Sequence, residues 1–82
     1  VMSEKIYNRI RLLRQEKGIS RQSLAGALGV NFQTIGYLER GEYNPSMKLA
    51  FKFSRYFNLP VEAIFSDKPF ESLTEILKRE NE

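Results

Sequence analysis

The sequence contains no cysteine and no histidine. The lack of cysteine excludes disulfide bonds and thiolate metal sites, and it is typical of a protein in a reducing cytoplasm. The sequence also has no glycine-rich phosphate loop and no paired-carboxylate motif, and its glutamates have no nucleophile beside them. These absences argue against an enzyme, and we expect neither a metal nor another cofactor.

Long apolar runs are also missing, and no signal peptide is recognisable. We therefore expect a soluble protein of the cytoplasm with no membrane partner. The 82 residues suffice for one domain and leave little room for a second core.

The net charge of +3 is unevenly distributed along the chain. Residues 1–57 carry ten basic and four acidic side chains, whereas residues 58–82 carry three basic and six acidic ones. A basic half attracts a polyanion such as nucleic acid, and an acidic half avoids it. An ordinary solvated surface of mixed charge gives the same pattern, so charge alone does not decide between the two.

The spacing of apolar residues predicts an all-α domain, because no stretch alternates as a strand would. The expected helices span residues 3–17, 21–28, 32–40, 47–57 and 61–65. The side chains expected to cap the first four are those of Ser3, Ser20, Asn31 and Ser46. The buried face of the fourth helix is expected to contain Met47, Ala50, Phe51, Ser54 and Phe57, widened by Phe53. In the fifth helix, Ile64 and Phe65 should complete the core.

Residues 66–82 form an extension beyond this core. Ser72 and Glu75 make a capping box, which predicts an additional short C-terminal helix. Its apolar edge contains Leu73, Ile76 and Leu77. This edge would pack on its own subunit or contact a partner, unless the helix is simply frayed.

Residues 21–40 have the pattern of two short helices joined by an abrupt turn. Ala25 is small where two crossing helices approach, and Gly29 allows the positive φ that a tight turn needs. The side chains expected to point inward are Leu24, Leu28, Val30, Ile35 and Leu38. This is the pattern of a helix-turn-helix, in which one helix supports another that lies in a DNA groove.

The chain resembles the small Xre-type, lambda-repressor-like or Cro-type helix-turn-helix regulators. The matching segments are IRLLRQEKGIS (10–20), LAGALGV (24–30), QTIGYLERGEYNPS (33–46) and LPVEAIF (59–65). The resemblance implies a compact five-helix DNA-binding domain in residues 1–65, acting as a homodimer on a palindromic operator. It also implies a structural ion pair between Arg14 and Glu39. The chain departs from the family at Arg21, where Gln is usual, and at Phe32, where polar residues are commoner.

The third helix would expose a face for the DNA bases that includes Gly36. The residues expected to read bases are Phe32, Gln33, Thr34 and Tyr37. Gln33 is the strongest candidate, because its amide can bond adenine through two atoms, although it could be an ordinary solvated residue. Phe32 would contact a thymine methyl group or pack against the domain. The residues expected to contact the DNA backbone are Arg21, Gln22, Arg40, Tyr43, Asn44 and Lys48, with Arg11 at the periphery.

Two functions remain open from the sequence. The first is a sequence-specific regulator of transcription, acting as a repressor at the nucleoid, whose dimer contact uses the C-terminal third. The residues expected to be available for that contact are Phe70, Leu73 and Leu77. The second is an antitoxin or an adaptor that uses the same fold and the acidic 66–82 segment to bind a protein partner.

Overall fold

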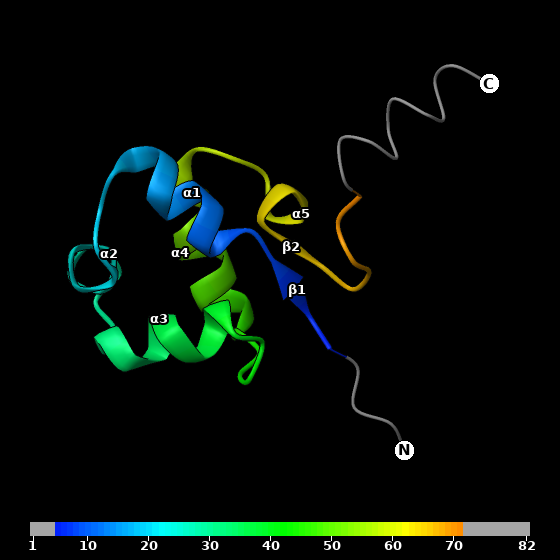
Figure 1. The fold of residues 1–82 in the computed structure, drawn as a ribbon, viewed down its shortest axis with the longest axis horizontal. Helices are drawn as coiled ribbons and strands as arrows, with labels where there is room; N and C mark the ends of the chain where they lie inside the picture. The colour runs from blue at the N-terminus through cyan, green and yellow to red at the C-terminus, as the bar shows by residue number, and fades with distance from the viewer. Residues whose placement is uncertain (1–4, 72–82) are drawn as a thin grey trace.

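The computed structural model describes residues 5–71 and contains five helices within them (Figure 1). The helices are α1 (Ile10–Lys17), α2 (Arg21–Leu28), α3 (Phe32–Glu39), α4 (Met47–Phe57) and α5 (Val61–Ile64). Figure 1 shows α2 at the opposite end of the domain from a short pair of strands. The predicted five-helix domain is therefore confirmed, with changes at both of its ends.

The first change is a two-stranded antiparallel sheet where no strand was expected. Strand β1 (Tyr7–Asn8) pairs with β2 (Phe65–Ser66), so that Tyr7 lies opposite Ser66. The predicted helix over 3–17 was wrong in its first part, because α1 begins only at Ile10. The predicted cap, Ser3, lies outside the described residues. At the other end, α5 stops at Ile64 because Phe65 enters β2.

Asn8 explains why the chain stays extended before α1. Its side-chain oxygen accepts a hydrogen bond from the backbone amide of Ile10 at 3.1 Å. Its side-chain amide donates to the backbone carbonyl of Leu38 at 2.7 Å, at the end of α3. The backbone amide of Arg9 also donates to the carbonyl of Ile64 at 2.9 Å. These bonds satisfy the amides of Arg9 and Ile10 at the start of α1, and the carbonyl of Leu38 at the end of α3, without a further helical turn.

The hydrophobic core collects side chains from all five helices. Its buried members are Ile10, Leu24, Ala25, Leu28, Ile35, Leu38, Leu49, Ala50, Phe53, Phe57, Ile64 and Phe65. Phe53 is completely buried, and its ring packs against those of Phe57 and Phe65 with centroid separations of 6.4 and 5.5 Å. The expectation that Ile64 and Phe65 complete the core is confirmed.

The buried face of α4 differs from the predicted one. Leu49, Phe53 and Phe57 follow one another at intervals of four residues and face the core. Met47 and Phe51, expected to be buried, are 76% and 49% exposed. Two apolar stripes run along this helix, both with helical spacing, and only packing against the other helices selects between them. The hydroxyl of the half-buried Ser54 donates to the carbonyl of Leu59.

Two of the four predicted N-cap side chains are confirmed. Ser20 and Ser46 accept hydrogen bonds from the backbone amides of Ser23 and Leu49, as N-cap side chains should. Asn31 occupies the N-cap position of α3, but its side chain makes no capping hydrogen bond there. The caps at Ser20 and Ser46 fix where α2 and α4 begin.

Candidate nucleic-acid interface

The turn between α2 and α3 determines which face of α3 is exposed. Gly29 has φ of 72°, in the left-handed region that glycine adopts without steric cost. The next amide, of Val30, donates to the carbonyl of Ala25 at 3.0 Å, which ends α2 abruptly. The chain then reverses so that Ile35 and Leu38 are buried against α2. The opposite face of α3 is left open.

That open face carries the residues expected to read bases. Phe32, Gln33 and Tyr37 are exposed, and Thr34 is half-buried at its edge. Gly36 was expected to be exposed with them, but it is buried. The side chain that covers it is Arg40, from the residue just after α3.

Arg40 lies back along α3 and is held in that position. Its Nε donates to Glu42 Oε2 at 2.7 Å, and its guanidinium carbon lies 5.3 Å from the centre of the Tyr37 ring. A Cβ atom built on Gly36 would be 3.1 Å from Arg40 Nη1. The guanidinium therefore lies so close to Gly36 that a side chain there would press on it.

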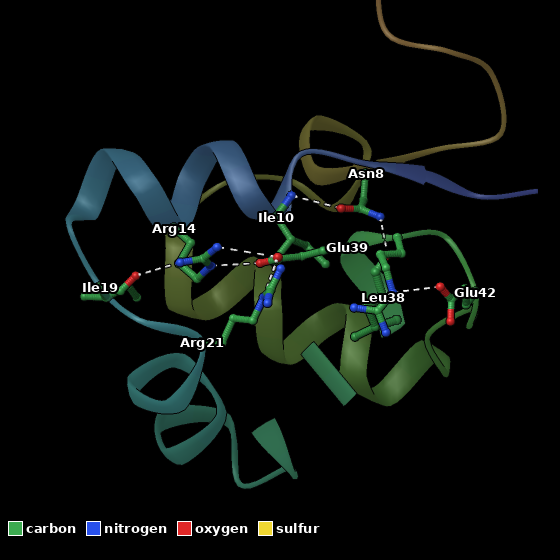
Figure 2. A network of polar contacts seen from close by, with 9 residues as sticks. Asn8, Ile10, Arg14, Ile19, Arg21, Leu38, Glu39 and Glu42 are labelled. Carbon is green, nitrogen blue, oxygen red and sulfur yellow. Dashed lines mark hydrogen bonds and ion pairs between the residues drawn. The ribbon is translucent and has the colours of Figure 1, made fainter. Parts of the chain in front are cut away.

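A second group of charges joins three helices behind this face (Figure 2). Arg14 Nε on α1 and Arg21 Nε on α2 donate to the two carboxylate oxygens of Glu39 on α3, at 2.8 and 2.9 Å. Arg14 also donates from Nη1 to the carbonyl of Ile19 at 3.1 Å. The pair implied by the resemblance, Arg14 with Glu39, is thus present. The bond from Arg21 to Glu39 was not predicted, because the two residues are 18 positions apart and no local sequence pattern indicates the contact.

This network has an electrostatic consequence for the surface. The side chain of Glu39 is 2% exposed, whereas those of Arg14 and Arg21 are 14% and 40% exposed. One carboxylate neutralises only one of the two guanidinium groups, so the network keeps a net positive charge. Arg21, the more exposed of the two arginines, is the first residue of α2. The unpaired backbone amides at this end of the helix also favour an anion.

The other residues expected to contact the DNA backbone lie around α2 and α3. Arg21, Gln22 and Phe32 line one surface cleft together with Arg11 and Arg14. Tyr43 and Asn44 are exposed in the loop after α3, and Lys48 is exposed in the first turn of α4. Lys52 on α4 donates to the carbonyl of Leu28 at 3.3 Å and so binds the end of α2. Arg21 and Gln22 thus share a cleft with Phe32, at the start of α3.

Residues 5–71 contain neither a metal-binding cluster nor a helix that could cross a membrane. No group of three or more acidic side chains there is arranged to hold a metal ion. None of the helices in that range combines the length and the apolar character that crossing a membrane requires.

Comparisons with known proteins agree with this geometry. A model of the helix-turn-helix family matches residues 10–64. A protein of Archaeoglobus fulgidus named an HTH-type transcriptional regulator is 46% identical over 57 residues, which are 70% of this chain and 81% of that protein. The Bacillus subtilis regulator YgzD, also named HTH-type, is 36% identical over 58 residues, 71% of this chain and 88% of its own.

A solved structure extends the comparison to three dimensions. The restriction-modification controller protein C.AhdI from Aeromonas hydrophila is 31% identical and superposes with a TM-score of 0.62, over 67% of this chain and 83% of that protein. Family model, relatives and fold agree on the same class. The chain belongs to the helix-turn-helix family, as a small Xre-type regulator with a lambda-repressor-like DNA-binding domain.

Proposed function

We propose that this protein is a sequence-specific regulator of transcription that places α3 in the major groove of double-stranded DNA. The observation that carries the proposal is the asymmetry of α3. One face is buried on α2, while the other exposes Gln33 and two aromatic rings among basic donors. We propose further that the protein acts as a repressor in the cytoplasm, at the nucleoid, without catalysis or a cofactor. Within residues 5–71 no feature favours an antitoxin or an adaptor over this function.

The N-terminal turn of α3 supplies the base contacts in this proposal, since these residues of a recognition helix enter the groove most deeply. Gln33 bonds N6 and N7 of an adenine with its side-chain amide. Phe32 contacts a thymine methyl group with its exposed ring. Thr34 reaches a base edge or a phosphate from the side of the helix, and Tyr37 bonds the sugar-phosphate backbone or a base through its hydroxyl.

The backbone contacts orient α3 and carry no sequence information. Arg21 contributes one of them, because the bond of its Nε to Glu39 leaves its terminal nitrogens to donate to a phosphate. Glu39 belongs to α3, so this contact also ties the recognition helix to the DNA backbone. The remaining donors proposed for phosphates are those of Gln22, Tyr43, Asn44 and Lys48.

Gln33→Ala is expected to weaken binding to the preferred site by roughly 1–3 kcal/mol and to relax the preference at one base pair in each half-site. The reason is the loss of two hydrogen bonds that only adenine can form in the major groove. Arg21→Ala is the matched comparison, and it should weaken binding to preferred and random duplexes alike. Competition binding against all single-base-pair variants of the site measures both. If Gln33→Ala lowers every affinity equally, Gln33 contacts the backbone and not a base.

We also propose that the protein binds DNA as a homodimer. One recognition helix reads only a few base pairs, and two-fold symmetry places a second copy about 34–36 Å away, on the next turn of the same groove. We divide the chain into a DNA-binding part, residues 1–65, and an extension, residues 66–82, that supplies the dimer contact. Of the three residues expected there, Leu73 and Leu77 lie outside the described residues. Phe70 is half-buried, and Arg9 lies 4.1 Å from its ring centre.

Sedimentation is expected to show the intact chain as a dimer at tens of micromolar. A chain truncated after Glu71 keeps every described residue and should sediment as a monomer, because it lacks the proposed apolar edge of residues 72–82. Circular dichroism of the truncated chain checks that the five helices are retained. A monomeric intact chain would reject the dimer, and a dimeric truncated chain would remove residues 72–82 from its interface.

A further inference from the structure

The open face of α3 contains one position that is unlike its neighbours. Gln33, Tyr37 and Arg40 follow one another at intervals of three or four residues and therefore share a face of the helix. Gly36 lies within this face and has no side chain, yet it is buried while Gln33 and Tyr37 are exposed. The atom nearest to its missing side chain is Arg40 Nη1, 3.1 Å from the position of a Cβ. The guanidinium of Arg40 thus occupies the space above Gly36.

Helical geometry explains how a residue after the helix reaches this position. Side chains of a helix point back towards its N-terminus, so that residue i covers the surface over the preceding turn. A long side chain at 40 can therefore place its charge over position 36, and it can approach most closely where that residue has no Cβ. Glycine costs a helix about 1 kcal/mol relative to alanine, and here it makes room for the guanidinium.

Two further contacts fix the orientation of Arg40. Glu42 accepts a hydrogen bond from Nε at 2.7 Å, and the Tyr37 ring lies beside the guanidinium at 5.3 Å. Because Glu42 binds the Nε side, the two terminal nitrogens remain as a fork. The side chain is still 49% exposed, so this fork is accessible to a ligand.

We infer that Arg40 reads a guanine in the major groove and so determines specificity, in place of the phosphate contact that its sequence position suggested. This inference rests on the proposed function. Arg40 lies along the recognition helix, in line with Gln33, and so on the face that the proposed function assigns to the bases. Guanine presents two acceptors, N7 and O6, and a two-nitrogen fork is the group that matches them. Glu42 and Gly36 are positioning residues for this contact.

The test uses the intact chain and a duplex selected by it from random DNA, together with every single-base-pair variant of that duplex. Arg40→Ala is expected to reduce the discrimination at one G·C pair in each half-site by roughly 5- to 150-fold, with the other positions unchanged. Lys48→Ala is the matched control, because a lost phosphate contact should weaken all the duplexes by the same factor.

Gly36→Ala distinguishes an effect on base recognition from an effect on the stability of the fold. The new methyl group pushes the guanidinium aside by a few tenths of an ångström, so discrimination at the same G·C pair should fall, by less than in Arg40→Ala. Alanine also supports the helix, so the thermal unfolding midpoint should stay the same or rise. A uniform loss of affinity in Arg40→Ala, or a G·C preference that survives it, would overturn this inference alone. A wild-type chain that prefers no sequence would overturn the proposed function as well.

Discussion

Raising the monovalent salt concentration from about 50 to 200 mM is expected to weaken DNA binding by this protein by about 10²- to 10³-fold. Each phosphate that a Lys or Arg neutralises releases counterions, and the logarithm of the affinity falls with the logarithm of the salt concentration with a slope near −0.9 per phosphate. Two or three cationic contacts in each protomer, led by Arg21 and Lys48, give a dimer about four to six such phosphates, and hence a slope of about −4 to −5. Fluorescence anisotropy on a selected duplex, at constant pH and temperature, measures this slope.

Arg21→Ala provides the control for the salt series. Each contact removed should reduce the slope by about one, and a dimer loses two of them. Gln33→Ala should lower the affinity and leave the slope unchanged, because a neutral amide releases no counterion. An affinity that hardly changes with salt would contradict the phosphate contacts proposed for α2 and α4.

Phe53→Ala is expected to lower the free energy of unfolding by about 3–5 kcal/mol. The ring is completely buried and packs between Phe57 and Phe65, so its removal loses apolar burial and leaves a cavity. Domains of this size have only about 4–12 kcal/mol in total, and the variant should therefore be marginally folded. Urea unfolding followed by circular dichroism gives the difference.

Phe51→Ala is the matched control, since it removes the same side chain from the same helix. Its ring is half exposed, so the cost should stay near 1 kcal/mol or below. This pair also tests which of the two apolar stripes of α4 faces the core. Equal losses, or a larger loss for Phe51→Ala, would contradict the packing of α4.

The helix-turn-helix could be predicted from the sequence because local chemistry determines it. Ser20 caps α2 by accepting a hydrogen bond from the amide of Ser23, only three residues later. Gly29 forms the turn because glycine can adopt a positive φ. The buried face of α3 follows from the spacing of Ile35 and Leu38. Each of these signals lies within one helix or one turn, and none requires a distant partner.

The features that sequence reasoning missed depend on distant partners. The start of α1 is determined by strand pairing with Ser66 and by the bond from Asn8 to Leu38. The face of α4 is decided by packing, since both of its stripes have helical spacing. Arg21 reaches Glu39 across the interface of α2 and α3. At the candidate site, the position of the Arg40 side chain over Gly36 was not predicted. In a sequence, a glycine within a helix indicates only that the helix is less stable there.

Selection of bound sequences from a pool of random duplex DNA tests most directly the proposal that α3 reads DNA sequence. The intact chain should enrich a two-fold symmetric motif whose half-sites are centred about one helical turn, or 10–10.5 base pairs, apart. The same selection with Gln33→Ala should lose the preference at one position of each half-site and retain the others. A pool that shows no enriched motif after repeated rounds, although the protein binds DNA, would contradict the proposal.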